Sequence, residues 1–453
     1  GPPPALIIQD ELHLISGPLG SMVGLYEPVI ESLCTDDRFE KPIKPKIVAS
    51  TATTRNYISQ IKGLYGRDSV MLFPQAINRV NETYFSEVMY DKDTGKKQRG
   101  SLYLGLNPAT YGSAQTSAAK LAAILKQAPN MVPDLSDKSM DYYRTSVWFF
   151  NSLKELGMTL TLMQSTTRDM IGGLRQSQRL PAAAEKASYP SRILELTSRI
   201  DSSKVSTALT RLSKPITDPS SYDTCLASSI MEVGVDVPRL GLLTIMAQPK
   251  TTSQYIQVSG RVGRDRKKGP GLIVMLYNSK RSRDRSIYER FQSYHESVYA
   301  QVEPISVTPF AIQAMQHGLK GAIISMYRMS TPDDYKPNGI DWGKFEEAVE
   351  VIRQRISKLG VNDQSLLDFE KQVKNLRAYM EVYSPSEWAY THREQYIEHD
   401  SATQPALMRG RREPLYPQVA GDKSIMVMTS MRSVDGQTKL EIQAPYAFIE
   451  GGE

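Results

Sequence analysis

The chain has very few cysteines and no long apolar run. Its 453 residues include only Cys34 and Cys225, which lie far apart and lack the paired spacing of zinc sites and disulfide frameworks. This scarcity favours a reducing compartment, so we expect a cytoplasmic protein. No apolar stretch reaches about 18 residues, and the N-terminus lacks a signal-peptide pattern, so we expect a soluble chain without a membrane partner.

The charge balance is mildly basic. The chain carries 55 Lys and Arg against 49 Asp and Glu, a formal net charge of +6, and its pI is about 8.9. This excess permits nucleic-acid binding without requiring it, because charge must be clustered on one surface to act. The length predicts about two to four domains and does not limit the size of the cores.

The most informative stretch runs from Gln254 to Arg264 and reads Gln-Tyr-Ile-Gln-Val-Ser-Gly-Arg-Val-Gly-Arg. On one continuous helix, four long polar side chains would share an arc of roughly 80°: Gln254, Gln257, Arg261 and Arg264. Guanidinium groups never deprotonate and grip phosphate oxygens in pairs, so they suit a triphosphate. Gly260 and Gly263 each cost about 1 kcal/mol in a helix interior, which indicates close approach of a backbone or a ligand. The alternative is a basic amphipathic helix whose arginines face water.

A second candidate site follows the first apolar run. Residues Pro4 to Gln9 contain Ala-Leu-Ile-Ile, which predicts a fully buried strand of a parallel sheet, and Asp10 and Glu11 come directly after it. Ligands collect at the carboxyl ends of such strands. An acidic pair at this position would lie where a nucleotide and its metal ion bind. Asp10 would hold Mg²⁺ through water, and Glu11 would orient or deprotonate the water molecule that attacks the phosphate of the nucleotide. A solvated acidic turn is the alternative.

Five stretches resemble, in the required order, motifs of superfamily-two helicases. They are Asp10 to His13, Ser50 to Thr53, Asn151-Ser152, Cys225 to Leu240 and Gln254 to Arg264. The first resembles the motif that names DEAD-box and DEAH-box proteins, although its third letter is Leu12. The resemblance implies an α/β fold with part of a first RecA-like domain and a complete second one, each a parallel sheet with helices on both faces, followed by a mainly helical accessory region. It implies ATP and Mg²⁺ as cofactors.

The resemblance also implies residue roles. The catalytic residues would be Asp10, Glu11, Gln257, Arg261 and Arg264, with the two acidic residues and the two arginines converging on one triphosphate. The nucleotide would also contact His13, Gly234 and Asp236, the last through the ribose or through the arginines. Nucleic-acid phosphates would meet Ser50, Thr51, Thr53, Asn151, Thr197, Ser198, Arg199, Ser228 and Ser229. Ordinary helix caps and strand-to-helix turns explain several of these hydroxyls equally well.

We predict four segments: residues 1–78 for the partial first domain, 79–295 for the second domain, 296–400 for the helical region and 401–453 for a C-terminal extension. Further strands are expected at Lys46–Ser50, Leu102–Leu106, Ser146–Phe150, Leu242–Ala247 and Leu272–Tyr277. A basic run follows the last of these, with Lys280, Arg281, Arg283 and Arg285. Such a run is solvated by default, and in a nucleic-acid motor it would lie along a phosphate backbone.

The sequence contains no glycine-rich loop ending in Gly-Lys-Ser or Gly-Lys-Thr, whose amides and lysine would cradle phosphates. We therefore expect an upstream half of the same helicase to supply it. Residues 6–20, 51–55 and 248–257 resemble the helicase subunit of the bacterial DISARM anti-phage defence systems. That resemblance implies DNA, single-stranded or with a single-stranded end, as substrate, and a protein partner subunit. The alternatives are a non-catalytic DNA-binding or scaffold module and an RNA-directed helicase.

Overall fold

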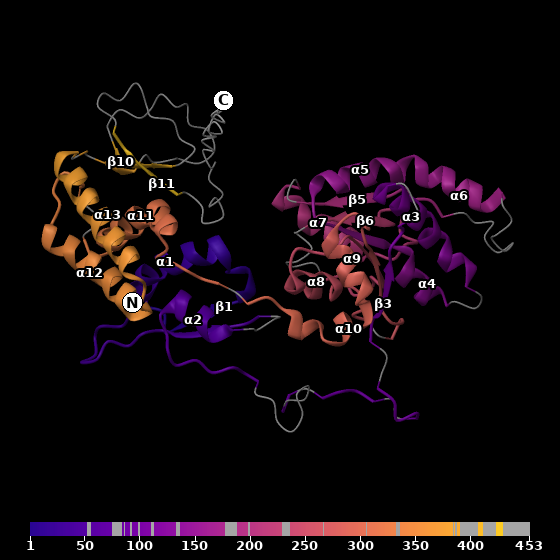
Figure 1. Cartoon of the computed structure of the whole chain (residues 1–453), viewed down its shortest axis with the longest axis horizontal. Coiled ribbons are helices and arrows are strands. Elements are labelled where there is room, and N and C mark those ends of the chain that lie inside the picture. Colours follow the sequence, from indigo (N-terminus) through magenta and orange to yellow (C-terminus); the bar gives the residue numbers. More distant parts are fainter. Residues whose placement is uncertain are drawn as a thin grey trace, which may run out of the picture. The chain divides into compact units, whose positions relative to one another are not determined.

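The computed structural model describes residues 1–51, 56–74, 84–85, 87–90, 93–97, 100–109, 113–132, 136–176, 188–197, 200–228, 236–265, 267–304, 306–331, 336–383, 385, 387–389, 406–410 and 423–428. The chain forms two compact units (Figure 1). Unit 1 comprises residues 1–72 and 304–453, and unit 2 comprises residues 73–303. The helices after residue 303, which we expected to form a region of their own, therefore belong to the same unit as the N-terminal segment.

Unit 2 is built on a six-stranded sheet in the order β3-β8-β7-β4-β6-β5, with every neighbouring pair parallel. Its strands are β3 (Leu102–Leu106), β4 (Ser146–Phe150), β5 (Ile193–Leu196), β6 (Thr224–Ala227), β7 (Leu242–Met246) and β8 (Leu272–Leu276). Strands β4, β6 and β7 are buried along their whole length. This burial requires cover on both faces, and it explains the continuous apolar runs in the sequence.

Helices cover both faces of the sheet of unit 2. They are α3 (Ala114–Met131), α4 (Asp137–Arg144), α5 (Leu153–Gln164), α6 (Thr166–Gln176), α7 (Ser202–Ser213), α8 (Thr252–Ser259), α9 (Ser282–Glu289) and α10 (Phe291–Glu296), with the short helix η4 (Val298–Gln301) after them. One core joins α3 and α5 to the face that carries Trp148, and the other joins α7 and α8 to the face that carries Phe149. The alternation of side chains along β4 thus supplies both cores.

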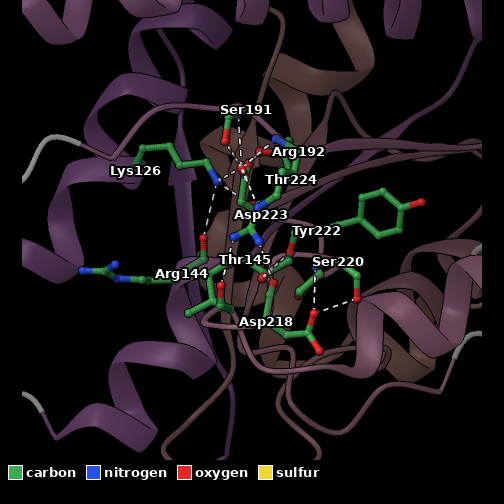
Figure 2. A network of polar contacts seen from close by, with 12 residues as sticks. Lys126, Arg144, Thr145, Ser191, Arg192, Asp218, Ser220, Tyr222, Asp223 and Thr224 are labelled. Atoms are coloured by element: carbon green, nitrogen blue, oxygen red, sulfur yellow. Dashed lines mark hydrogen bonds and ion pairs between the residues drawn. The ribbon is translucent and has the colours of Figure 1, made fainter.

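A buried polar network lies at the amino ends of β4, β5 and β6 (Figure 2). The Lys126 ammonium group lies 3.1 Å from the Asp223 carboxylate, and it also donates to the Asp223 and Arg144 carbonyls. The second Asp223 carboxylate oxygen accepts bonds from Ser191 and from the Arg192 amide. Burial alone would raise the pKa of Asp223, but the ion pair with Lys126 and these hydrogen bonds lower it to about 2. The network ties α3 to the strand starts, away from the carboxyl ends where ligands collect.

Unit 1 begins with two parallel strands, β1 (Leu6–Gln9) and β2 (Lys46–Ala49). We predicted that β1 would be fully buried, and this is wrong. Side chains alternate between the two faces, and helices cover only the face that carries Ile47. On the opposite face Leu6 is 49% exposed and Ile8 is 72% exposed.

Helices from both ends of the sequence form the main core of unit 1. They are η1 (Leu12–Leu14), α1 (Gly17–Leu33), α2 (Tyr57–Tyr65), α11 (Ile312–Met329), α12 (Trp342–Leu359) and α13 (Asp363–Val382). Helix α11 packs directly on α1, and the two glycines of α11 at the contact explain why. A Cβ atom on Gly318 would lie 2.3 Å from Met22, and one on Gly321 would lie 2.3 Å from the Tyr26 hydroxyl. Only glycine allows the two helices to approach this closely.

A buried charge cluster joins α12 to α1 within unit 1. The Glu31 carboxylate lies 3.3 Å from the Arg355 guanidinium, 3.1 Å from that of Arg67 and 2.6 Å from the Lys44 ammonium group. Since Arg355 is almost fully buried, moving α12 away would leave its charge unpaired. This contact gives a physical reason for the helices after residue 303 to fold with the N-terminal segment.

Three short parallel strands complete unit 1: β9 (Glu387–Ala389), β10 (Ala406–Gly410) and β11 (Ile425–Val427). They form a sheet in the order β11-β10-β9, and Leu407 and Ile425 join the helical core. None of the helices in the described parts of the chain combines the length and the apolar character that crossing a membrane requires.

Candidate functional site

The acidic turn of unit 1 is held by the next strand. The Ser50 hydroxyl, at the end of β2, donates a short hydrogen bond to an Asp10 carboxylate oxygen, which also accepts the Glu11 amide at 2.9 Å. These two donors, chiefly Ser50, hold the pKa of Asp10 below its ordinary value. The structure therefore brings together Asp10 and Ser50, which we assigned to separate motifs, at the carboxyl ends of neighbouring strands.

Glu11 adopts a left-handed backbone conformation, with φ of +52°. Such conformations are costly for residues with a Cβ atom, and they cluster at sites of function. Its carboxylate lies 3.4 Å from Nδ1 of His13, and that nitrogen lies 3.2 Å from the Thr51 hydroxyl. The candidate residues of the first two stretches thus form one group, with an ionised aspartate at its exposed edge.

The predicted continuous helix from Gln254 to Arg264 is wrong in its second half. Helix α8 ends at Ser259 with Gly260 as its C-cap, so Arg261 and Arg264 lie in the turn that follows. The backbone reverses after Gly260 because Gly263 adopts φ of +80° and its amide donates to the Leu240 carbonyl. The two arginines are therefore positioned by a glycine turn, and the shared helical face does not exist.

The turn places Arg264 against the loop before β7. One Arg264 nitrogen lies 2.6 Å from the Asp236 carboxylate, and its Nε donates to the Gly260 carbonyl. On α8, Gln257 is buried, and its side-chain Nε2 has no hydrogen-bond acceptor within the described part of the chain. A buried donor without an acceptor costs about 1–3 kcal/mol, which is unusual unless a ligand completes it.

The two glycines of this turn predict different effects of substitution. A Cβ atom on Gly263 would lie 2.7 Å from the Gly271 Cα atom, at a φ that residues with a Cβ atom rarely adopt, so Gly263→Ala should destabilise unit 2 by about 1–3 kcal/mol. Gly260 has φ of −74° and its nearest atom would lie 3.3 Å away, so Gly260→Ala should change stability by less than about 1 kcal/mol. Urea unfolding measures both. Equal effects would contradict the close approach of Gly263 to Gly271.

Three predicted nucleic-acid contacts lie at the carboxyl ends of neighbouring strands. Asn151 follows β4, Ser228 follows β6 and Thr197 follows β5. The Asn151 amide donates to carbonyls of residues 246–248, so it fixes the loop after β7. The Thr197 side chain is fully buried and donates to Glu195, which corrects our expectation of an exposed phosphate contact. Five other predicted residues lie outside the described residues: Thr53, Ser198, Arg199, Ser229 and Gly234.

Two residues that hold the backbone near the candidate site were not predicted from the sequence. Gln60, on α2, donates its side-chain amide to the Leu12 and Ile15 carbonyls and so holds the backbone after Glu11. Asp284 is buried within the basic run, and its carboxylate accepts the amides of Gln248 and Asn278. Burial raises the pKa of Asp284 despite these bonds. An acidic residue among arginines was the available signal for Asp284, whereas nothing in the sequence singles out Gln60.

Residues 150–266 match the family model of the helicase conserved C-terminal domain. The matched residues all lie in unit 2. The match runs from the end of β4 through the turn after α8, and its fold is the RecA-like parallel sheet described above. The resemblance to superfamily-two helicases and the α/β fold class predicted from the sequence are therefore confirmed. The candidate residues of unit 2, from Asn151 to Arg264, all lie within the matched residues 150–266.

A curated relative extends the similarity beyond the helicase domain. The DISARM protein DrmA of Bacillus paralicheniformis is 38% identical over 333 residues, which cover 73% of this chain and 29% of that protein. The predicted similarity to DISARM proteins is thereby confirmed. The chain spans less than a third of the length of this relative.

Solved helicase structures are also similar. The helicase MrfA bound to DNA gives a TM-score of 0.47 at 17% identity, covering 77% of this chain and 38% of that one. The helicase Lhr of Mycobacterium smegmatis, bound to single-stranded DNA and AMP-PNP, gives a TM-score of 0.46 at 14% identity, covering 77% of this chain and 36% of that one.

Proposed function

We propose that this protein is a nucleic-acid-dependent ATP hydrolase of superfamily two, a helicase or translocase that acts on DNA in anti-phage defence. The defence role draws on the similarity to a DISARM protein. The observation that carries the enzymatic proposal is the contact of Arg264 with Asp236, within the residues that match the helicase C-terminal domain. The two residues come from two separate stretches of the sequence, both predicted to serve the nucleotide.

In the proposed mechanism, Arg261 and Arg264 stabilise negative charge on the γ-phosphate as it transfers. A guanidinium suits this role because it stays charged and donates two parallel bonds. Asp236 holds Arg264 in place, and the Nε2 donor of Gln257 finds its acceptor on the nucleotide. An arginine acting on the transferring phosphoryl group is worth about 10³–10⁵ in rate in comparable enzymes.

Asp10 and Glu11 supply the acidic part of the same reaction. One Asp10 carboxylate oxygen accepts hydrogen bonds from the Ser50 hydroxyl and the Glu11 amide. The carboxylate is exposed and ionised, which fits water-mediated binding of Mg²⁺. A bound Mg²⁺ would supply positive charge that offsets the negative charge of the phosphate groups. Glu11 orients the attacking water or accepts its proton, and His13 limits the orientation of the Glu11 carboxylate.

The carboxyl edge of the sheet in unit 2 is the proposed nucleic-acid surface. Asn151 follows β4 there and holds the loop after β7, and Ser228, which is 7% exposed, follows β6 on the other side of β4. Contacts of this kind grip the backbone and do not read bases. The proposal further includes an upstream half of the helicase that supplies the phosphate loop, and a partner subunit of a defence complex.

An ATPase assay with added nucleic acids tests this function. We expect ATP hydrolysis by the protein that includes the phosphate loop to rise with single-stranded DNA, or with duplex DNA carrying a single-stranded end. RNA at the same salt concentration is the comparison, because backbone contacts depend strongly on salt. Equal or greater stimulation by RNA would favour the RNA-directed alternative.

The second candidate is a non-catalytic DNA-binding or scaffold module. It is favoured by the lack of a Gly-Lys-Ser or Gly-Lys-Thr loop in the sequence. DNA binding without any nucleotide hydrolysis, in the presence of the phosphate loop, would establish this alternative and end the enzymatic proposal.

A further inference from the structure

A hollow of ≈ 500 Å³ opens on unit 2 between α8, α9, α10 and η4. Its wall carries two arginines, Arg283 and Arg290, and three serines, Ser286, Ser293 and Ser297. Guanidinium and hydroxyl groups are the side chains that most often contact nucleic-acid phosphates. None of these five residues belongs to the helicase motifs considered above.

The basic residues of this region differ in their partners. Arg281 pairs with Glu155 at 2.5 Å, and Arg285 pairs with Glu289 at 2.8 Å. Among the described residues, Arg283 donates to the Lys250 carbonyl at 2.6 Å, and neither Arg283 nor Arg290 forms an ion pair. Of the four arginines of this segment, the two without an ion pair to a described residue are therefore the two that line the hollow.

One carboxylate, that of Glu303, also lines the hollow, and it already accepts hydrogen bonds from the first turn of α8. Both of its oxygens lie 2.9 Å from the Thr252 amide, in the first turn of α8. The positive end of the helix dipole offsets the charge of an anion at this position. The arginines are left to set the electrostatic character of the opening.

The hollow lies at the edge of the sheet where the candidate nucleic-acid residues lie. Helix α8 follows the carboxyl end of β7, and α9 follows that of β8. Asn151 donates to the Gln248 carbonyl, and Arg283 donates to the Lys250 carbonyl two residues further along the same loop, so the hollow adjoins the loop that Asn151 holds. A strand of nucleic acid lying on this edge would continue into the hollow.

We propose that this hollow binds phosphate groups of a single nucleic-acid strand through Arg283 and Arg290, and that it extends the nucleic-acid surface of unit 2. This inference rests on the proposed function, because it concerns the same substrate. It adds a site on α9 and α10, outside the residues that the helicase resemblance assigns.

Substitution of Arg290 by glutamine tests the site. For the whole chain and a labelled oligodeoxythymidine of about 20 nucleotides, Arg290→Gln should weaken binding about fivefold at about 0.1 M salt. The slope of log affinity against log salt should become shallower by about 0.7, because one phosphate contact is lost. Arg290→Lys should restore most of the slope. Fluorescence anisotropy at several salt concentrations measures both quantities.

Arg168→Gln is the matched control, since it removes the same charge from an exposed position of α6, outside the lining of the hollow and outside the basic run. Its salt slope should equal that of the unmodified chain. If Arg290→Gln and Arg168→Gln behave alike while the unmodified chain binds DNA, this inference fails and the proposed function stands. If the unmodified chain binds neither DNA nor RNA, both fail. A loss of ATP affinity with unchanged DNA affinity would identify a nucleotide site and overturn the inference.

Discussion

Glu11→Gln should reduce ATP turnover by about 10²–10⁴-fold while leaving ATP binding intact, because it removes the group that orients or deprotonates the attacking water. The amide keeps the size of the side chain, so the left-handed backbone at Glu11 and the bond between Asp10 and Ser50 should persist. The measurement is steady-state hydrolysis, with nucleotide binding followed separately, in the protein that includes the phosphate loop. The loss should appear in kcat, since the group acts on the transition state.

Glu40→Gln is the control for this change, because Glu40 is an exposed glutamate of the same unit outside the acidic turn. It should leave both kcat and nucleotide binding unchanged. Turnover of Glu11→Gln within a few-fold of the unmodified protein would remove Glu11 from the mechanism. A joint loss of binding and turnover would instead point to a structural effect on the acidic turn.

Lys126→Met should destabilise unit 2 by about 3–5 kcal/mol, the largest stability effect that we expect in this chain. Only 2% of the Lys126 side chain and 8% of the Asp223 side chain are exposed, so the substitution leaves a buried carboxylate whose remaining counter-charge is the half-buried Arg192 guanidinium, 4.0 Å away. Protonation of Asp223 does not easily remove this buried negative charge at neutral pH, because Ser191 and the Arg192 amide still donate hydrogen bonds to the carboxylate. The network in Figure 2 would therefore lose its only buried ammonium group while keeping its anion.

Urea unfolding measures this cost, with Trp148 as the probe of unit 2. Trp148 is fully buried in the sheet, and the other two tryptophans, Trp342 and Trp388, belong to unit 1. Replacing those two by phenylalanine in the common background isolates the signal. Lys154→Met, at an exposed position of α5, is the control and should change stability by less than about 0.5 kcal/mol. A cost for Lys126→Met no greater than for Lys154→Met would contradict the importance of the buried pair.

The sequence by itself determined the parallel sheet of unit 2 and the identity of its motifs. Strands such as β4 read as continuous apolar runs because both of their faces are covered, and that pattern depends only on local composition. The order of the motif-like stretches was likewise visible without coordinates. The acidic pair after β1 could be placed at a strand end because a short apolar run directly precedes it.

Only the tertiary structure decided how the candidate side chains are held. The turn after α8 depends on the approach of Gly263 to Gly271, two residues that no helical periodicity connects. The pairing of Arg264 with Asp236 depends on that turn, and the bond between Ser50 and Asp10 depends on β1 lying beside β2. The packing of α11 with α1 depends on contacts between residues nearly three hundred positions apart, such as Met22 and Gly318. Hydrophobic periodicity in the sequence indicates which face of a helix or strand is apolar, whereas long-range contacts determine which element packs against that face.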